Sequence, residues 1–342
     1  MPGEARDRED LPNRILRWGI SYIDDSLEGI FANDLVLLGA PPGVGKTAMC
    51  VGIATTNLMD EKRIHLIALE AHTFEIERRL KYRYFCEAFF SDHNRPHLDG
   101  PMNFKSWLLG RYKEQTRVYN DYAEEFCRKA FVNLFTLYKT SKFGVADMVE
   151  QVNSVATETD LVIIDHAHYF DFDDKSDNES LKRIVHTARD LTQEIGRPMI
   201  LVAHLRKRDR GSKELCPGMD DFHGSSELAK VATKCVTIAP GTVTVDGKYV
   251  TYIRCSKDRN DSGPARYLGI TTFNPKKGGY DEQYRIAWAN SEQPCELPVE
   301  YRPDWARHYA SGGGGNSAPQ KPAAVVTRAP VQRAATRVYV PD

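Results

Sequence analysis

The chain has 342 residues, of which 41% are hydrophobic and 27% charged, and its formal net charge is −1. This composition is typical of an ordinary soluble globular protein with one large α/β domain or two small ones. The near-zero charge excludes a polycation, so any binding of nucleic acid must come from local loops. Seven scattered cysteines without a C-x-x-C pair favour reduced thiols over a disulfide framework or a zinc cluster. No apolar run approaches the length of a membrane span, and the charged residues 1–13 do not form a signal peptide, so we expect a cytoplasmic protein without membrane contact.

The first motif in chain order is the segment Asp34–Cys50, with the sequence DLVLLGAPPGVGKTAMC. Its apolar run Leu35–Leu38 predicts a buried strand, residues 39–45 form a Gly- and Pro-rich loop, and the apolar residues after Thr47 predict a helix. Strand, loop and helix follow each other in the order that a phosphate-binding P-loop requires. A Gly-rich turn in front of a helix is the alternative interpretation, and the register of the glycines, the lysine and the hydroxyl argues against it.

Each residue type in this loop has a physical role in binding a nucleotide. Gly43 and Gly45 allow backbone conformations in which several N–H groups point at one anion, and the helix N-terminus adds a partial positive charge. Lys46 is expected to reach the β- and γ-phosphates of ATP, and Thr47 to bind Mg²⁺ through its hydroxyl. The first position of the usual G-x-x-x-x-G-K-[ST] pattern is Ala40, which is small enough to be tolerated there. The residues expected to bind ATP are Ala40, Pro41, Pro42, Gly43, Val44, Gly45, Lys46, Thr47 and Ala48.

The apolar run Ile64–Leu69 predicts a second strand, and Glu70 stands at its carboxyl end. Ligands bind at this edge of α/β sheets, and a carboxylate there can polarise water for attack on the γ-phosphate. A glutamate that merely begins a helix is the alternative. Residues 73–130 are predicted to be mostly helical, with a break at 93–100 and a further helix over 104–126. We interpret the aromatic residues of this region as core rather than as a surface that stacks on bases.

A short strand is predicted over Asn133–Leu137, and a helix over Val145–Ala156. A further strand is predicted within Asp160–His166, where four consecutive apolar residues precede Asp165. This is the pattern of a Walker B strand that is buried on both faces. Asp165 would hold the Mg²⁺ shell together with Thr47. His166 and His168 could suggest a metal pair, but we favour strand-end histidines without a metal.

An acidic stretch, residues 171–179, precedes a predicted helix, Leu181–Ile195, and a strand that ends at His204. The densest basic cluster of the chain follows in residues 206–213. Lysine and arginine side chains in such a loop can contact nucleic-acid phosphates without reading the sequence, and a solvated basic loop is the alternative. The residues expected to contact DNA are Arg206, Lys207, Arg208, Arg210 and Lys213.

The last part of the fold is predicted to consist of antiparallel strands. Thr242–Val245 and Lys248–Ile253 flank an Asp-Gly turn that is typical of a hairpin, and more strands follow as far as Trp288. From Ser311 the chain is rich in Gly, Pro, Ala and Gln, and it cannot bury enough apolar surface to order itself. Its end, Arg337–Asp342, could be a docking peptide for a protein partner on a flexible tether.

These motifs resemble those of the RecA-like P-loop ATPases, and within them the motor domain of DnaB-type replicative helicases and of plasmid-encoded hexameric helicases of the RepA type. Ile15–Leu35 carries the Gly, Leu and Asp positions that precede the P-loop strand in that family. Phe222–Val236 is similar to the family's Gly-Ser, helix and strand segment. Arg254–Asn260 is similar to its Lys-x-Arg-Asn segment, with Gly263–Pro264 two residues later than usual. The resemblance covers about residues 15–290, and we expect a stand-alone motor domain without the family's N-terminal primase-interacting domain.

The resemblance also implies roles for individual residues. Glu70 takes the place of the family's catalytic glutamate, and His204 that of the polar residue that senses the γ-phosphate. A satisfied strand-end histidine is the alternative for His204. Lys257 and Arg259 take the places of the cations that reach into the ATP site of a neighbouring subunit, with basic edge-strand residues as the alternative. The basic cluster in residues 206–213 corresponds to the second DNA-contacting loop of RecA-like motors.

The implied fold is an α/β RecA-like P-loop NTPase core, with a mostly parallel central sheet flanked by helices and antiparallel strands at the C-terminal edge. We expect it to span residues 14–295, with a helical insertion at about 73–130. A flexible N-terminus is expected at 1–13, a connector at 296–310 and a disordered tail at 311–342. The implied function is that of an ATP- and Mg²⁺-dependent DNA helicase that acts on single-stranded DNA as a homo-oligomer, either a hexameric ring or an open helix.

Two other functions remain open. The acidic stretch, the near-neutral charge and the tail suggest an ATP-dependent switch or loader protein of DNA replication or recombination that works through a protein partner. A small-molecule kinase with the same P-loop is the least favoured function. The sequence shows no evident lid or acceptor pocket, but it does contain a segment that could reach a neighbouring subunit.

Overall fold

The computed structural model of the chain describes residues 14–20, 23–24, 27–171, 177–206, 216–222, 226–245, 248–260 and 267–281. The strands of this part are β1 (Leu35–Ala40), β2 (Ile64–Ala68), β3 (Leu134–Tyr138), β4 (Leu161–Asp165), β5 (Met199–His204), β6 (Lys234–Val245), β7 (Lys248–Asp258), β8 (Tyr267–Asn274) and β9 (Gly279–Asp281). They form one sheet in the order β3-β2-β4-β5-β1-β6-β7-β8-β9. The pairs from β3 to β6 are parallel, and those from β6 to β9 are antiparallel. The predicted fold class is therefore confirmed.

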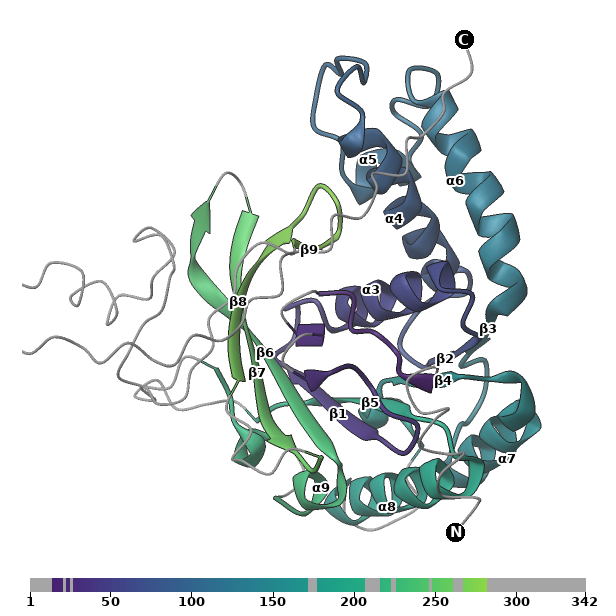
Figure 1. Cartoon of the computed structure of the whole chain (residues 1–342), viewed down its shortest axis with the longest axis vertical. Helices are drawn as coiled ribbons and strands as arrows, with labels where there is room; N and C mark the ends of the chain where they lie inside the picture. Colours follow the sequence, from purple (N-terminus) through teal and green to yellow (C-terminus); the bar gives the residue numbers. More distant parts are fainter. Residues whose placement is uncertain are drawn as a thin grey trace, which may run out of the picture.

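Helices cover both faces of the parallel part of the sheet (Figure 1). They are α3 (Lys46–Met59), α4 (Glu75–Ser91), α5 (Phe104–Leu108), α6 (Arg117–Ala130), α7 (Val145–Ser154), α8 (Asp177–Ile195) and α9 (Ser226–Val231). In β1, Val36 and Leu38 join the hydrophobic cluster on the side of α3, whereas Leu35 and Leu37 join the cluster on the side of α8. Successive side chains of a strand point to opposite faces, so a strand with helices on both faces needs the continuous apolar run seen in the sequence.

The parallel strands bring distant parts of the sequence to two opposite edges of the sheet. Ala40, at the end of β1, pairs with His204, at the end of β5, and Ala68 of β2 pairs with Asp165 of β4. We call the edge formed by these four residues the carboxyl edge, and the opposite edge, where β1 begins at Leu35, the amino edge. The loops that follow β1, β2, β4 and β5 all leave from the carboxyl edge, which is where open α/β sheets bind ligands.

The region predicted as a helical insertion contains α4, α5 and α6, which project beyond the sheet in Figure 1. Tyr82 and Tyr84 of α4 are buried, so the interpretation as core is confirmed for them, whereas Phe74 of the same region is 61% exposed. The single helix predicted over 104–126 is wrong, because turns at 109–116 separate α5 from α6. Gly110 adopts a left-handed conformation in these turns, with φ of 67°, which ends the α5 segment.

Other boundaries also differ from the sequence analysis. The acidic stretch 171–179 is not wholly a loop, because α8 begins at Asp177 rather than at Leu181. Acidic residues are favourable in the first turn of a helix, where they face the positive end of its dipole. The strand predicted from Asn133 begins at Leu134, and the helix predicted to end at Ala156 ends at Ser154.

The predicted hairpin is confirmed by the pairing of Val245 with Lys248 in β6 and β7. Several predicted features lie outside the described residues, and nothing in the structure tests them. They are the N-terminal segment 1–13, residues 223–225, the turn at 246–247, Gly263–Pro264, the strand predicted to end at Trp288, the connector and the tail.

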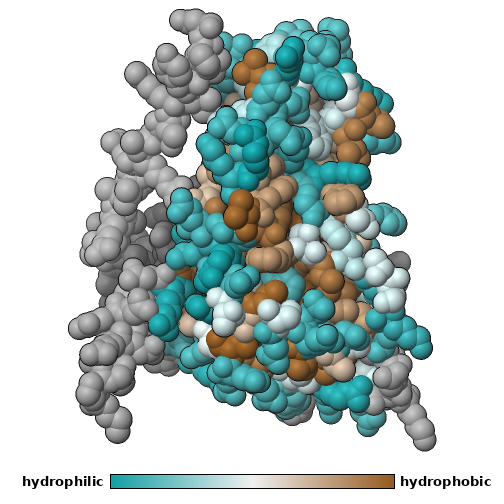
Figure 2. Space-filling view, turned by 90° about the vertical axis from the view of Figure 1, so that its right-hand side faces the viewer, coloured by the Kyte–Doolittle hydropathy of each residue, from teal (hydrophilic) through white to brown (hydrophobic). Residues whose placement is uncertain are grey.

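The side of the molecule near β3 and α6 shows hydrophobic residues scattered among hydrophilic ones (Figure 2). Exposed large side chains there include Val118 on α6 and Phe135 on β3. The described cysteines, from Cys50 to Cys255, are buried free thiols. Among the described helices, none combines the length and apolarity that crossing a bilayer requires.

Candidate functional site

The loop between β1 and α3 has the backbone of an anion cradle. Gly43 and Gly45 have φ of 76° and 99°, values that L-residues with a side chain rarely adopt. Gly45 is the N-cap of α3, and no described side chain caps the first N–H groups of this helix. These donors can therefore serve an anion bound at the helix N-terminus. The predicted contact residues between Pro41 and Ala48 line this loop and the first turn of α3.

Lys46 is held inside this cradle. Its side chain is buried, and Nζ lies 3.4 Å from the carbonyl oxygens of Ala40 and Pro41. Burial lowers the pKa of Lys46, while the nearby carboxylates of Asp165 and Glu70 act in the opposite direction. The lysine is thus a cation that is only weakly compensated, and the phosphates of a nucleotide would supply the missing negative charge.

Thr47 and Asp165 meet across the carboxyl edge, as the sequence predicted for a Mg²⁺ site. The Thr47 hydroxyl donates to Oδ2 of Asp165 over 2.7 Å. The other carboxylate oxygen, Oδ1, is buried without a hydrogen-bond partner among the described residues, and burial raises the pKa of Asp165. A buried carboxylate oxygen without a partner normally signals an ion or water. Hydroxyl and carboxylate oxygens suit Mg²⁺, so these residues fit the ion that the sequence implied.

Glu70 follows β2 at the same edge. The backbone N–H groups of Leu69 and Glu70 donate to the carbonyl oxygen of Asp165 over 2.8 and 3.4 Å, which fixes the chain at this point beside β4. The Glu70 side chain is 47% exposed, and its Oε2 lies 3.1 Å from Nε2 of His166. Its carboxylate also raises the pKa of Tyr169. Glu70 is thus close to the cradle and open to water, as a residue that activates water must be.

Three histidines gather behind Glu70. The ring centroid of His204 lies 4.2 Å from that of His166 and 4.9 Å from that of His168. His204 pairs with Ala40 in the sheet, so it stands between the cradle and the β4 strand, where the γ-phosphate sensor was expected. Burial lowers the pKa of His166 to about 3, with His204 and His168 adding to the shift.

The same histidines include the pair that could suggest a metal site. Within the described part of the chain, no group of three His, Cys, Asp or Glu residues is arranged to hold a metal ion. The contact of all three rings was not foreseen, although the pattern was visible. Two neighbouring parallel strands end at the same edge, and each carries histidine at or just beyond its last residue.

The basic cluster predicted to contact DNA begins at the carboxyl edge. Arg206 is exposed, and its N–H donates to the carbonyl oxygen of Asp221 over 2.7 Å. A β-bridge between Leu205 and Phe222 closes the base of this loop. Phe222 packs against Gly39 of β1, where an added Cβ would meet its ring at 2.5 Å. The loop therefore starts beside the strand that carries the cradle. Lys207, Arg208, Arg210 and Lys213 lie outside the described residues.

Lys257 and Arg259 lie away from the cradle of their own chain. Lys257 donates from Nζ to the carbonyl oxygens of Ala229 and Lys230, over 2.8 and 2.6 Å, at the end of α9. The N–H of Arg259 donates to the carbonyl oxygen of Thr233, beside the start of β1. The cradle begins beyond the other end of β1, about 16 Å away at roughly 3.3 Å per residue. The exposed Arg259 side chain therefore stands at the amino edge and does not reach the cradle of the same chain.

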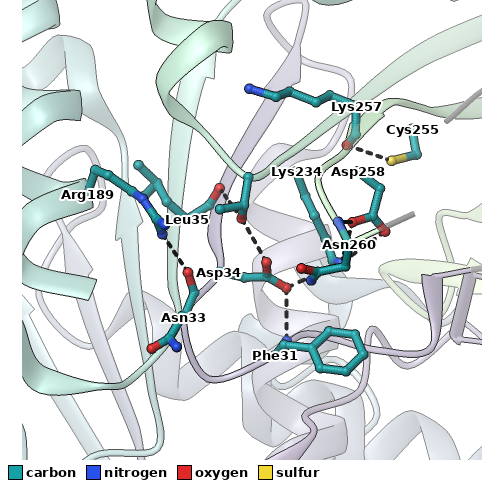
Figure 3. A network of polar contacts seen from close by, with 11 residues as sticks. Phe31, Asn33, Asp34, Leu35, Arg189, Lys234, Cys255, Lys257, Asp258 and Asn260 are labelled. Atoms are coloured by element: carbon teal, nitrogen blue, oxygen red, sulfur yellow. Dashed lines mark hydrogen bonds and ion pairs between the residues drawn. The ribbon is translucent and has the colours of Figure 1, made fainter. Parts of the chain in front are cut away.

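A buried ion network fixes this end of the sheet (Figure 3). Lys234 is fully buried, and its Nζ lies 3.3 Å from Asp34 and 2.9 Å from both carboxylate oxygens of Asp258. The Thr233 hydroxyl and the Phe31 N–H donate to Asp34 over 2.7 and 2.9 Å. The network ties the starts of β1 and β6 to the end of β7, and so it positions the segment that carries Lys257 and Arg259.

Tyr280 contributes to the cradle and was missed in the sequence analysis. It comes from β9, and its hydroxyl donates to the carbonyl oxygens of Val44 and Gly45 over 3.1 and 3.3 Å. The ring is buried in the cluster that also contains residues of α3. Nothing in the local sequence around Tyr280 indicates that it reaches the P-loop.

Comparison with known proteins agrees with the fold. A family model described as an AAA domain, AAA_25, matches residues 4–210. One solved structure of an ATPase domain is similar at a TM-score of 0.65 and 16% identity, over 78% of this chain and 90% of that one. A DnaB-like replicative helicase, solved in a study of its interactions with primase, is similar at a TM-score of 0.66 and 16% identity, over 78% of this chain and 61% of that one. A search of curated proteins found no match.

Proposed function

The chain belongs to the AAA_25 family of AAA-domain proteins and has the RecA-like P-loop ATPase fold of DnaB-type motor domains, and from this premise we propose that it is an ATP-hydrolysing motor that acts on single-stranded DNA as an oligomer. The catalytic parts of this proposal are the residues at the carboxyl edge. Its motor part depends on the segment at the amino edge and on the basic loop that begins at Arg206.

The residues at the carboxyl edge divide the work of hydrolysis among them. The backbone of Gly43 to Lys46 would hold the phosphates, with the Lys46 amine countering the charge that develops on the transferred group. Thr47 and Asp165 would hold Mg²⁺, which supplies further positive charge to the phosphates when bound. Glu70 would orient and polarise the attacking water. His204, beside the end of β1, would respond to the presence of the γ-phosphate.

The main support for an oligomer is the distance between the cradle and the cationic segment of Lys257 and Arg259 within one chain. Arg259 stands at the amino edge, and the length of β1, about 16 Å at roughly 3.3 Å per residue, separates this edge from the cradle. An arginine that stabilises charge on a phosphoryl group must contact it, so in this role Arg259 would serve the cradle of another copy. The buried network of Lys234, Asp34 and Asp258 supports this role because it holds the segment rigid from behind.

The contacts at the base of the basic loop support an action on DNA. The bridge between Leu205 and Phe222 lies one residue from His204, and Phe222 packs on Gly39 at the start of the P-loop. A shift of His204 on binding or loss of the γ-phosphate would therefore act directly on the base of the loop. Arginine and lysine residues there would contact phosphates of any DNA sequence.

Two activity measurements test the motor. The purified protein should hydrolyse ATP faster when single-stranded DNA is added at low salt, and Lys46→Ala should abolish hydrolysis in both conditions. An ATPase rate that ignores DNA at low salt would contradict the motor assignment while leaving the ATPase assignment intact.

Mixing two inactive variants tests the shared site. Lys46→Ala lacks a working cradle, and Arg259→Ala lacks the cation offered to the next copy. Pairs in which an intact cradle meets an intact Arg259 form only when the two variants co-assemble, so the mixture should recover part of the activity. A mixture no more active than the sum of its components, or full activity of Arg259→Ala at high dilution, would exclude the shared site.

An ATP-dependent switch that works through a protein partner is the second candidate. The acidic residues around the start of α8 favour it, since carboxylates repel the phosphates of DNA. Deletion of residues 311–342 separates the two functions. The switch would lose its partner in a pull-down, whereas the motor would keep its DNA-stimulated ATPase.

A further inference from the structure

His166 is a buried side chain that points at the candidate catalytic carboxylate. It follows Asp165 directly at the end of β4 and is fully buried. Its Nε2 lies 3.1 Å from Oε2 of Glu70, a distance at which the two groups attract each other, although the N–H and the oxygen are not aligned as in a hydrogen bond. No other described group satisfies this nitrogen. A buried polar atom of this kind calls for an explanation in the site itself.

The second ring nitrogen shows where the proton of His166 is. Nδ1 accepts a hydrogen bond from the backbone N–H of His168 over 3.3 Å, as the cap of the short 3₁₀ helix η3 (Ala167–Tyr169). A nitrogen that accepts a hydrogen bond carries no proton, so the proton of the ring is on Nε2. The nitrogen that faces Glu70 is therefore a donor, and a carboxylate is the acceptor that suits it.

His166 and Glu70 differ in how closely the protein encloses them. The ring of His166 is enclosed by His204, at 4.2 Å between ring centroids, and by Tyr169, at 4.7 Å and nearly perpendicular. The Glu70 side chain is half exposed on the turn after β2. A fixed donor next to an exposed carboxylate limits its rotation, and alignment of the His166 N–H with the Glu70 oxygen would complete a hydrogen bond between them. The restrained carboxylate stays on the side of Lys46 and Asp165, whose charges interact with it.

We propose that His166 is a positioning residue that orients the Glu70 carboxylate for activation of the attacking water. The inference rests on the proposed ATPase function and adds to it a residue that neither the motifs nor the family pattern assigned. His166 takes no proton and contacts no phosphate in this role. It acts only through Glu70, because the geometry of a catalytic group must be held closely for the group to be effective.

Two substitutions of similar size separate this role from a structural one. His166→Asn keeps an oxygen near the position of Nδ1, so it can still cap the His168 N–H, but its amide is too short to reach Glu70. His166→Gln places an amide nitrogen near the position of Nε2, so it can still donate to Glu70. We expect His166→Asn to lower kcat by about 10- to 100-fold at saturating ATP and Mg²⁺. His166→Gln should stay within a few-fold of the wild type, and the affinity of both for a fluorescent ADP analogue should be unchanged.

A double-mutant cycle with Glu70→Gln isolates the coupling between the two residues. On the Glu70→Gln background, His166→Asn should change the residual rate by less than about 2-fold, since the carboxylate that it positions is already lost. The buried His65, which lies on β2 and does not contact Glu70, supplies the matched control. His65→Phe should leave kcat near that of the wild type.

Different results would contradict the role of His166 and the proposed ATPase function. An unchanged or raised kcat in His166→Asn, or an equal loss on both Glu70 backgrounds, would overturn the role of His166. Should the asparagine variant unfold below the assay temperature, kcat of His166→Gln decides alone, and a loss as large as that of Glu70→Gln would reject the proposal. If the wild type does not hydrolyse ATP, or Lys46→Ala leaves the rate unchanged, the proposed function itself fails.

Discussion

The hydroxyl of Tyr280 donates to the carbonyl oxygen of Val44 over 3.1 Å, across 236 positions of sequence. The contact joins β9, the last strand of the sheet, to the loop that follows β1 near its centre. Burial raises the pKa of Tyr280, so the hydroxyl keeps its proton and remains a donor over the physiological pH range. The conformation of the P-loop is thus set in part by the antiparallel strands at the end of the fold.

Tyr280→Phe removes this donor and keeps the ring. We expect the free energy of unfolding to fall by about 1 kcal/mol, the usual net value of one hydrogen bond, and the affinity for ADP to fall with it. Urea unfolding and titration with a fluorescent ADP analogue measure the two effects. Tyr249→Phe, at a tyrosine that is 52% exposed, is the control and should change stability by less than about 0.5 kcal/mol. Equal stability of the two variants would show that the contact with Val44 does not stabilise the loop.

Gly45→Ala tests the backbone of the cradle. Gly45 has φ of 99°, and an added Cβ would lie 2.7 Å from the Tyr280 hydroxyl oxygen. We expect a loss of about 1–3 kcal/mol in the free energy of unfolding from the strained backbone, together with weaker ATP binding. Gly52→Ala is the matched control in the same helix region, because nothing lies within 4 Å of its added Cβ. There alanine should stabilise by about 0.5–1 kcal/mol, since it favours the helix interior. Urea unfolding of both variants would contradict this account if the two changes had the same sign.

Lys234→Met tests the buried ion network. The substitution leaves the carboxylates of Asp34 and Asp258 buried without their cation, with side chains 2% and 6% exposed. We expect a loss of about 3–5 kcal/mol in the free energy of unfolding, measured by urea denaturation. The exposed pair of Lys129 and Glu125, with side chains 76% and 58% exposed, gives the comparison. Lys129→Met should change stability by less than about 1 kcal/mol. A loss below that value for Lys234→Met would mean that the network contributes little.

His65 makes stability depend on pH. Burial lowers the pKa of this histidine from 6.5 to about 4, so the unfolded chain binds a proton there that the folded chain does not bind between these values. The contribution of neutral His65 to the free energy of unfolding is therefore fully present above pH 6.5 and is lost as the pH falls toward 4. As the pH falls through this window, the free energy of unfolding of the wild type should decrease by about 2–3 kcal/mol relative to that of His65→Leu, because each pKa unit corresponds to about 1.4 kcal/mol.

The measurement is the free energy of unfolding of both proteins in urea at several pH values. Other titrating groups cancel in the difference between the two curves. Parallel curves for His65→Leu and the wild type would contradict the assignment.

The sequence predicted the parts of the site that are encoded locally. The P-loop glycines, Lys46 and Thr47 stand together in one short segment, and Asp165 ends a strand whose apolar pattern is unmistakable. Because parallel strands end at a common edge, Glu70 and His204 could be assigned to the same region from strand order alone. The contact between Thr47 and Asp165 followed from the same reasoning.

The rest depends on contacts that no local pattern contains. Tyr280 reaches the P-loop only because the antiparallel strands bring β9 back beside α3. Lys234 would be expected on the surface, and its burial is explained by its pairing with Asp34 and Asp258, the first of them far away in the sequence. The break between α5 and α6 is set by turns in a stretch whose composition suits a helix. The role of Lys257 and Arg259 in a neighbouring copy stays a prediction, because Lys257 donates to the Ala229 carbonyl oxygen near the end of α9 in its own chain.

The cradle and Arg259 lie at opposite edges of one sheet, and this placement determines how many complete ATP sites an assembly contains. When every working centre needs both, a lone molecule has none, an open row of n molecules has n − 1, and a circle of n molecules has n. Turnover per molecule would then grow with the length of the row and gain its last increment when the two ends join. Any agent that opens the circle would silence a single centre and leave the others running.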